Sequence, residues 1–150
     1  MRKTTAKDAV QSATLLNEPD IHHWLLHEGK TKPKKPKKDG AKRLCVEQDG
    51  KIVGLIGFRP DLERNSHCAR FWIAFSKAAQ GTGLAETIFR TLFPVLQKEG
   101  IELLYSGVFS DNLRARRFYE KLGFKEYGRL PRGLKRGKKY FDEIFVYKKL

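Results

Sequence analysis

The most informative segment of this chain is Gln80-Gly81-Thr82-Gly83-Leu84-Ala85. It lies between a strand-like apolar run at 69–75 and a predicted helix whose apolar stripe is Leu84, Ile88, Leu92 and Val95. A glycine-bearing turn that opens a helix favours an anion, because the first N–H groups have no partner within the helix and the dipole is positive there. Gly81 and Gly83 also lack the Cβ atoms that would keep a diphosphate away from the backbone. The segment therefore predicts a site for a phosphorylated small molecule.

The spacing of this segment excludes two common phosphate loops. It is not G-x-x-x-x-G-K-[ST], and Glu86 stands where a G-x-G-x-x-G loop needs its third glycine. The six residues fit the pattern Q/R-x-x-G-x-G/A instead, through Gln80, Gly83 and Ala85. Taken alone, the hexapeptide also fits a plain helix-capping turn.

A second motif reads Asn112-Leu113-Arg114-Ala115-Arg116-Arg117-Phe118-Tyr119-Glu120-Lys121-Leu122-Gly123-Phe124. It follows a strand-like run at 103–109, and Gly123 suits the end of a helix. The motif matches N-x-x-A-x-x-F/L-Y-E-K-L-G-F at every position, and one helix and one strand separate it from the glycine turn. Together the two motifs resemble those of the GCN5-related N-acetyltransferase (GNAT) superfamily, in which the first binds the pyrophosphate of coenzyme A.

The resemblance implies an α+β fold: one central mixed sheet, mostly antiparallel, with splayed parallel central strands and flanking helices. We expect a single domain over 1–150, in keeping with its length. Asp49-Gly50 between strand-like runs at 43–48 and 51–58 predicts a hairpin. Further strands are expected at 2–5, 68–75 and 102–109, with a closing hairpin of 125–128 and 140–147 around a basic connection.

The N-terminal part of the chain is predicted to be helical after Thr5, a suitable N-cap, with a break near Pro19. Its expected apolar side comprises Ala9, Val10, Ala13 and Leu16, with Ile21, Trp24 and Leu25 beyond the break. Within the helix after the glycine turn, Pro94 removes a hydrogen bond and should kink or weaken it.

The resemblance also assigns the residues of an acetyl-CoA site. The turn Gln80, Gly81, Thr82, Gly83, Leu84 and Ala85 would bind the pyrophosphate, and strand backbone at 71–75, including Phe75, and at 104–108 would bind the pantetheine. Asn112 would hydrogen-bond a pantetheine amide, although asparagine is equally suited to be the N-cap of its helix. Phe118 is a further cofactor contact.

Tyr119 stands where the family has its general acid. A phenol can protonate a thiolate leaving group of similar or lower basicity. The acyl carbonyl would be polarised by a strand amide while an uncharged amine attacks it. Tyr119 also fits the amphipathic core side of its helix, beside Ala115, Phe118 and Leu122.

The general base is less evident, because many relatives use a strand glutamate and this chain has no acid between Glu63 and Glu86. His67, Glu63 and Asp61 are the candidates, and the amine would otherwise arrive neutral or lose its proton to water. His22 and His23 lie where relatives contact substrate, or form a solvated pair at a helix end. Cys68 has no evident histidine–acid partners for a nucleophilic role. The histidines and cysteines lack metal-ligand spacing, so no metal is expected.

The formal net charge is +14, and much of it gathers in two segments. The first, predicted to be a basic mobile loop at 30–42, contains Pro33, Pro36 and Gly40 and the cations Lys30, Lys32, Lys34, Lys35, Lys37, Lys38 and Lys42, with Arg43 directly after it. The second runs from Arg114 to Lys139 and includes Arg116, Arg117, Arg129, Arg132, Lys135 and Arg136. Such charge favours an anionic partner, such as a ribosome or nucleic acid, although a plain solvated surface fits as well. It would repel a cationic acceptor unless Glu63, Asp142 and Glu143 form an acidic pocket.

The sequence thus predicts a cytoplasmic acyl-CoA-dependent N-acyltransferase that transfers acetyl from acetyl-CoA directly to a primary amine. Cys45 and Cys68 are expected to be reduced thiols, and no apolar run is long enough to span a membrane. The sequence does not identify the amine acceptor, and it is compatible with a homodimer. The alternatives are a non-catalytic acyl-CoA-binding protein and a nucleic-acid-binding or ribosome-binding module of the same fold.

Overall fold

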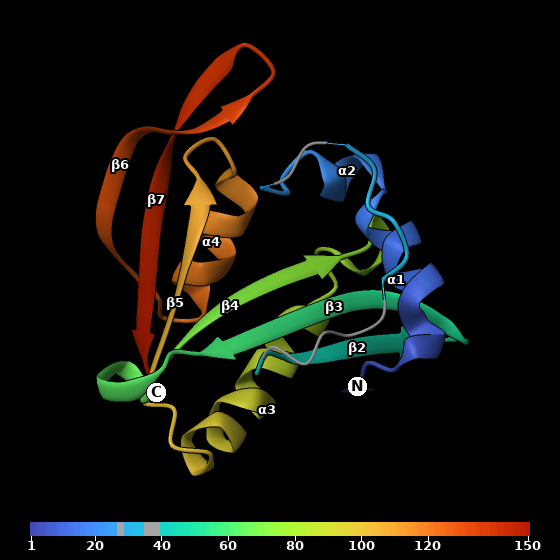
Figure 1. The fold of residues 1–150 in the computed structure, drawn as a ribbon, viewed down its shortest axis with the longest axis horizontal. Helices are drawn as coiled ribbons and strands as arrows, with labels where there is room; N and C mark the ends of the chain where they lie inside the picture. The colour runs from blue at the N-terminus through green and yellow to red at the C-terminus, as the bar shows by residue number, and fades with distance from the viewer. Residues whose placement is uncertain (27–28, 35–39) are drawn as a thin grey trace. The chain divides into compact units, whose positions relative to one another are not determined.

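The structure, a computed structural model, describes residues 1–26, 29–34 and 40–150 (Figure 1). Its strands form one seven-stranded sheet in the order β1-β2-β3-β4-β5-β7-β6. The strands are β1 Arg2–Lys3, β2 Lys42–Gln48, β3 Lys51–Pro60, β4 Cys68–Phe75, β5 Leu103–Phe109, β6 Lys125–Arg136 and β7 Lys139–Lys149. The α-helices of the described residues are α1 Ala9–Leu16, α2 Pro19–His22, α3 Leu84–Lys98 and α4 Leu113–Lys121, and 3-10 turns are η1 Ala6–Asp8, η2 Glu63–Asn65 and η3 Lys77–Ala79.

The chain divides into two compact units, which are described in turn. Unit 1 comprises 1–60 and 71–85, and unit 2 comprises 61–70 and 86–150. The mixed, mostly antiparallel sheet expected from the sequence is confirmed, with β4 and β5 as its parallel pair. None of the described helices is both long and apolar enough to cross a membrane.

Unit 1 contains the predicted hairpin of β2 and β3. Asp49 and Gly50 connect the strands with φ values of 50° and 73°, as a type I′ turn requires. The two strands pair from Lys42↔Phe58 to Gln48↔Lys51, with a bulge between Val46 and Glu47. The hairpin is therefore confirmed and slightly longer than expected.

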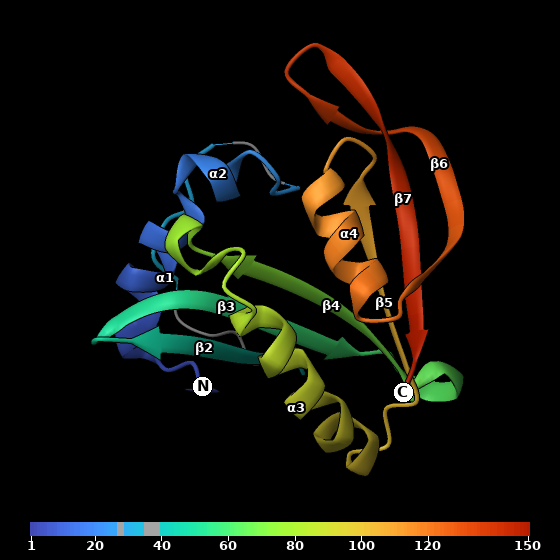
Figure 2. The ribbon, with the colours of Figure 1, turned by 180° about the vertical axis from the view of Figure 1, so that it is seen from behind.

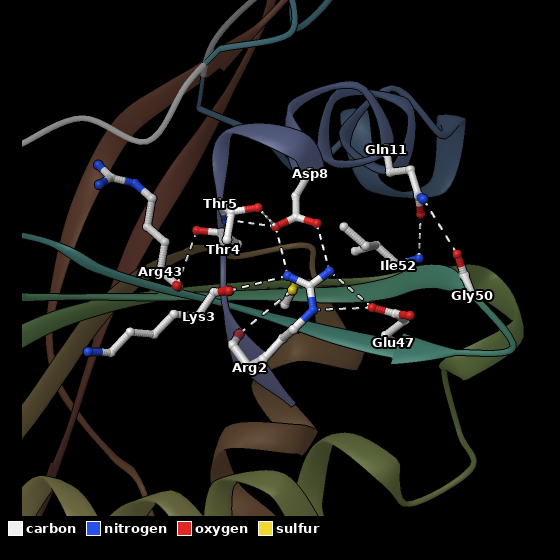
Figure 3. Close-up of polar contacts among 11 residues, drawn as sticks. Arg2, Lys3, Thr4, Thr5, Asp8, Gln11, Arg43, Glu47, Gly50 and Ile52 are labelled. Carbon is white, nitrogen blue, oxygen red and sulfur yellow. Dashed lines mark hydrogen bonds and ion pairs between the residues drawn. The ribbon is translucent and has the colours of Figure 1, made fainter.

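The N-terminus of unit 1 is tied to β2 by a network of charged groups (Figure 3). Asp8 is only 6% exposed and accepts hydrogen bonds from the Arg2 guanidinium at 2.8 and 2.7 Å and from the Thr5 N–H at 2.6 Å. Arg2 also reaches Glu47 of β2 at 3.0 Å. Thr5 is the N-cap of η1, as predicted, in a reciprocal capping box with Asp8.

The core of unit 1 includes a cluster of Leu15, Ile21, Cys45, Ile52, Leu55 and Ala74, with Leu16 and Leu25 partly buried against it. The expected apolar side of the first helix is wrong at Val10, which is 64% exposed, and it missed Leu15. The reason is local: a 3-10 turn with three residues per turn precedes α1, so the buried face is displaced from that of a continuous α-helix.

The basic segment falls partly outside the described residues. Residues 30–34 and 40–41 have no regular structure, while Lys42 already begins β2. Lys35, Pro36, Lys37 and Lys38 lie outside the part of the chain that the structure describes.

Unit 2 is built on β5, which pairs along its whole length with β7 from Leu103↔Lys149 to Phe109↔Glu143. The start of β4 pairs with it in parallel, through Cys68↔Leu103, Ala69↔Leu104 and Arg70↔Tyr105. Helix α4 lies over one face of these strands, in front of them in Figure 2. Its Phe118 meets Phe89 of α3 edge-on, with ring centroids 5.7 Å apart.

Two expectations for unit 2 need correction. The basic connection of the closing hairpin is mostly strand, because β6 and β7 pair up to Arg136↔Lys139 around an irregularity between Leu130 and Leu134. Backbone pairing extends through polar side chains there, which an apolar pattern cannot reveal. In α3 the buried residues are Ile88, Phe89, Leu92 and Leu96, whereas Val95 is 48% exposed because it lies one residue off the i, i+4 row. The helix continues past Pro94 to Lys98.

Candidate active site

The glycine turn of unit 1 is fastened to the end of β4. Gln80 donates a side-chain hydrogen bond to the Phe75 carbonyl at 2.8 Å, and its N–H donates to the Ser76 carbonyl at 3.1 Å. Thr82 donates from Oγ1 to the Ala79 carbonyl at 2.9 Å, and the same oxygen accepts from the Leu84 N–H at 3.3 Å. The first residue of the motif therefore holds the turn in shape, and Leu84 begins α3 as predicted.

Both glycines of the turn adopt the left-handed conformation, with φ of 76° at Gly81 and 81° at Gly83. A Cβ at either position would meet nothing within 4 Å. Backbone conformation rather than crowding therefore calls for glycine here. The open space beside both residues leaves room for a ligand at the start of α3.

The strand end next to the turn is closely packed. Phe75 is 6% exposed, and its ring lies where a Cβ on Gly54 of β3 would be. The next residue, Ser76, is 8% exposed, and its Oγ has no hydrogen-bond partner among the described residues. Ser76 could not be identified from the sequence, because no residue pattern shows that a serine is buried without a partner.

In unit 2 Asn112 is the N-cap of α4. It is 7% exposed, and its side-chain oxygen accepts a hydrogen bond from the Ala115 N–H at 3.1 Å. The N-cap interpretation is therefore confirmed. The contact with pantetheine stays a prediction, and in it the side-chain NH2 group of Asn112 would donate the hydrogen bond.

Tyr119 lies on the side of α4 that faces β5. It is 5% exposed, and its hydroxyl forms a hydrogen bond with Ser106, which is 6% exposed. Burial raises the pKa of Tyr119 well above its usual range, and the hydrogen bond from Ser106 opposes this only in part. The phenol consequently keeps its proton at neutral pH. Packing against Phe124, with ring centroids 5.7 Å apart, shows that it is a core tyrosine as well.

The predicted base candidates gather at the start of β4. Glu63 and His67 are exposed, Glu63 with a left-handed φ of 56°. The His67 carbonyl accepts from the N–H groups of Glu102 and Leu103, whereas Ser106 lies three residues further along β5, roughly 10 Å away. The structure therefore does not bring His67 together with Tyr119.

Asp61 is engaged elsewhere, because it accepts from the Tyr105 hydroxyl at 2.9 and 3.1 Å. Burial, with a further contribution from Asp61, raises the pKa of Tyr105 to about 12. This pair is therefore a neutral phenol donating to a carboxylate.

The other reactive side chains have ordinary surroundings. In unit 1, His22 Nε2 lies 2.7 Å from the Gly29 carbonyl, and the His23 ring packs edge-on against Trp24. Burial raises the pKa of the Cys68 thiol, which makes it a poor nucleophile. Over the described ranges, no group of three or more His, Cys, Asp or Glu side chains is placed to hold a metal ion.

The three acids proposed for an acidic pocket differ in their contacts. Glu63 is exposed on η2, and Asp142 pairs with Arg129 at 3.4 Å and accepts from the Arg132 N–H at 2.9 Å. Glu143 is partly buried, and its carboxylate lies against Gly107 of β5. A glycine inside a strand pattern indicates such a close approach, and Gly107 is the residue of this sequence that carries the signal.

The chain is similar to known proteins in sequence and in fold. The chain is 31% identical over 111 residues to an uncharacterised N-acetyltransferase, YokL, from an SPbeta prophage of Bacillus subtilis; the match covers 71% of this chain and 60% of that protein's length. A spermidine N-acetyltransferase from Vibrio cholerae, solved with CoA and spermine, superposes with a TM-score of 0.80 at 23% identity, covering 99% of this chain and 93% of that one. A ribosomal-protein-S5-alanine acetyltransferase from Vibrio fischeri does so with 0.83 at 17% identity, covering 99% and 91%.

The family model described as acetyltransferase (GNAT) family matches residues 10–124. That range contains both the glycine turn and the tyrosine-bearing helix. The chain therefore belongs to the GNAT family of acetyltransferases.

Proposed function

We propose that this protein is an N-acetyltransferase that moves the acetyl group of acetyl-CoA directly to a primary amine. The observation that carries the proposal is the turn at 80–85, where two left-handed glycines leave open space at the start of a 15-residue helix. Membership of an acetyltransferase family supports the same activity.

In this proposal the cofactor is bound by both motifs. The turn from Gly81 to Ala85 receives the pyrophosphate at the start of α3, with Gln80 holding the turn on β4. The pantetheine follows strand backbone at 71–75 and 104–108 and meets the Asn112 amide, with Phe118 as a further contact. No metal is required, since amide donors and the helix dipole supply the positive potential.

Tyr119 is proposed as the general acid. When the amine attacks the thioester carbon, the sulfur leaves as a thiolate that needs a proton. A buried phenol that stays protonated at neutral pH, and that Ser106 holds by a hydrogen bond, is suited to supply it. Burial also disfavours an unprotonated thiolate, so the proton transfer need not be uphill.

The direct test is acetyl-CoA turnover on a panel of amines, followed by mass spectrometry of the products. Gly83→Val should weaken acetyl-CoA binding at least tenfold by calorimetry, because a bulky side chain would occupy the ligand's space. Gly100→Val is the matched control: φ is 81° at Gly83 and 84° at Gly100, and neither Cβ would meet an atom within 4 Å. Both variants should lose a similar stability, about 1–2 kcal/mol, while only Gly83→Val loses affinity. Equal affinities would remove the turn from the cofactor site.

A second candidate function, binding of an anionic partner such as RNA, is favoured by the β6–β7 hairpin. Arg132 and Lys135 lie over the Tyr140 ring at 4.3 and 5.4 Å, so cations and an aromatic surface occur together, as in nucleic-acid sites. Binding to single-stranded RNA should weaken steeply with salt and be independent of coenzyme A. If RNA binding did not depend on salt, the basic side chains of the hairpin would be a solvated surface without a nucleic-acid partner. A ribosomal acceptor, a homodimer and a cytoplasmic location remain predictions of the same kind.

A further inference from the structure

We propose that the Glu143 carboxylate binds the ammonium group of the acceptor and removes its first proton. This inference rests on the N-acetyltransferase function proposed above. Glu143 would take the role of the strand glutamate that many relatives use, since this chain has no acidic residue between Glu63 and Glu86.

The first observation is the contact between Glu143 and β5. A Cβ on Gly107 would overlap Oε1 of Glu143 and lie 3.0 Å from its Cδ. Gly107 is not among the glycines with positive φ, so its backbone conformation does not call for glycine. The glycine instead lets a carboxylate come directly onto the backbone of the strand assigned to the pantetheine.

The second observation concerns the partners of the Glu143 side chain. Within 1–26, 29–34 and 40–150, no hydrogen bond or ion pair engages the side chain of Glu143. Its cross-strand neighbours are apolar, Phe109 on β5 and Leu130 on β6. The hairpin's arginines have other partners, since Arg129 pairs with Asp142 and Arg136 with Asp111 at 2.6 Å. The oxygens of Glu143 are therefore available to a cationic ligand.

The third observation is the position of Glu143 relative to Tyr119. Successive side chains of a strand point to opposite faces, so Ser106 and Gly107 face opposite ways. Ser106 faces α4 and forms a hydrogen bond with Tyr119, while Gly107 and Glu143 share the other face. An acid and a base on opposite faces of one strand suit a thioester bound along it, because the amine attacks from one side while the sulfur is protonated on the other.

The proton balance of the reaction is then complete. The ammonium gives its first proton to Glu143, which passes it to water. The neutral nitrogen bonds to the thioester carbon, and the tetrahedral intermediate loses a second proton from nitrogen to water. As the carbon–sulfur bond breaks, Tyr119 protonates the thiolate and regains a proton from water. One amide, one thiol and one proton in solution result.

The surroundings of Glu143 indicate the class of acceptor. Phe141 and Phe145 flank it on the same face of β7, two residues away on either side. The Arg136 guanidinium, whose ion-pair partner is Asp111, lies over Phe141 and Phe109 at 4.3 and 5.1 Å from their centroids, so these rings pack against a cation. The site therefore fits a primary alkylammonium group carried on an apolar chain.

The experiment compares two amines in acetyl-CoA-saturated protein, with thiol release as the readout. n-Butylamine is an ammonium at pH 7, whereas 2,2,2-trifluoroethylamine is mostly uncharged. Glu143→Gln should lower kcat/KM for butylamine about a hundredfold or more, but that for trifluoroethylamine less than about tenfold. The affinity for acetyl-CoA should not change. Retention of more than a third of the butylamine activity, or an equal loss with both amines, would overturn the proposal.

Two further variants sharpen the result. Gly107→Ala keeps the carboxylate but moves it, and it should fold because the overlapping atom is the end of a flexible side chain. It should show the same selective loss for butylamine, and unchanged activity would contradict the proposed contact. Glu126→Gln removes an exposed carboxylate of the same hairpin that pairs with Arg116 at 3.6 Å, and should stay within twofold of wild type.

A binding measurement separates this inference from the enzymatic one. In labelled protein without cofactor, n-butylammonium should shift the Gly107 amide resonance, and Glu143→Gln should abolish the shift. Absence of a shift in the wild type would refute the amine site even in an active enzyme. A clear shift with no acetyl-CoA turnover on any amine would support the site and refute the proposed function.

Discussion

Asp8 in unit 1 and Glu143 in unit 2 are both carboxylates drawn into the protein, yet their surroundings are opposite. Asp8 accepts hydrogen bonds from both guanidinium nitrogens of Arg2 and from Thr5, whereas Glu143 has neither ion pair nor hydrogen bond within the described ranges. A satisfied carboxylate stabilises the fold, and an unsatisfied one is available to a ligand. The two regions should therefore respond differently to mutation. Changes at Asp8 should lower the stability of the protein, whereas changes at the β5 site, which comprises Ser106, Gly107, Tyr119 and Glu143, should lower its activity.

The largest effect is expected at the β5 site, from Tyr119→Phe. Loss of the hydroxyl should lower kcat about a hundredfold, because general acid catalysis contributes that much or more. Affinity for acetyl-CoA should change little, since the ring and its packing remain. Steady-state kinetics with calorimetry would measure both, and wild-type kcat would remove Tyr119 from the acid role.

A loss of stability, without loss of activity, is expected from Asp8→Asn. The variant breaks the bidentate pair with Arg2 and should cost about 2 kcal/mol, less than a fully buried pair because Arg2 is 46% exposed. For a chain of this length that lowers Tm by roughly 4–8 °C. Thermal unfolding would measure it, with Glu47→Gln as the milder control, and a fall in kcat at 25 °C would contradict the assignment of Asp8 to structure alone.

The difference in stability between wild type and Asp8→Asn should disappear at acid pH. Hydrogen bonds from Arg2 and Thr5 hold the pKa of Asp8 well below its usual value of about 3.9, so the folded protein binds fewer protons than the unfolded chain. This contribution is fully present above about pH 5 and declines as the pH falls through about 4 and below. The Tm gap between wild type and Asp8→Asn should therefore shrink from pH 7 to pH 3. A gap that grows on acidification would reverse the sign.

The smallest effect is expected at Ser76, whose hydroxyl is buried without a partner in the described structure. Ser76→Ala removes an unsatisfied group, so Tm should stay the same or rise slightly. A fall of several degrees would mean that the hydroxyl has a partner, and Ser76 would then resemble Asp8 rather than Glu143.

The parts of the fold that residue type dictates locally could be predicted from the sequence. Asp49-Gly50 demanded a turn with two left-handed residues, and Asn112 is an N-cap as its side chain favours. The glycine turn before Leu84 and the strands around it followed in the same way. Each of these features depends on interactions within a few residues.

The parts that failed depend on the exact phase of a helix or on contacts distant in sequence. The apolar pattern suggested Val10 and Val95 for the core, but the phase of a preceding 3-10 turn and the i, i+4 row of α3 exposed both. The extent of β6 and β7 follows from pairing between polar residues. The base candidates His67 and Glu63 stay predictions made from their place in the sequence. The contact between Glu143 and Gly107 joins residues 36 positions apart on two paired strands, a register that no local pattern encodes.

The pairing of β5 with β7 consequently constrains how this region can evolve. Ser106 and Gly107 are consecutive, so deleting one residue from the first half of β5 would invert every later side chain. The serine would turn from the phenol and the glycine from the carboxylate, even if the sheet itself survived. We therefore expect length changes in this protein's descendants to be tolerated in the loops before and after β5, and point substitutions rather than indels to accumulate within it.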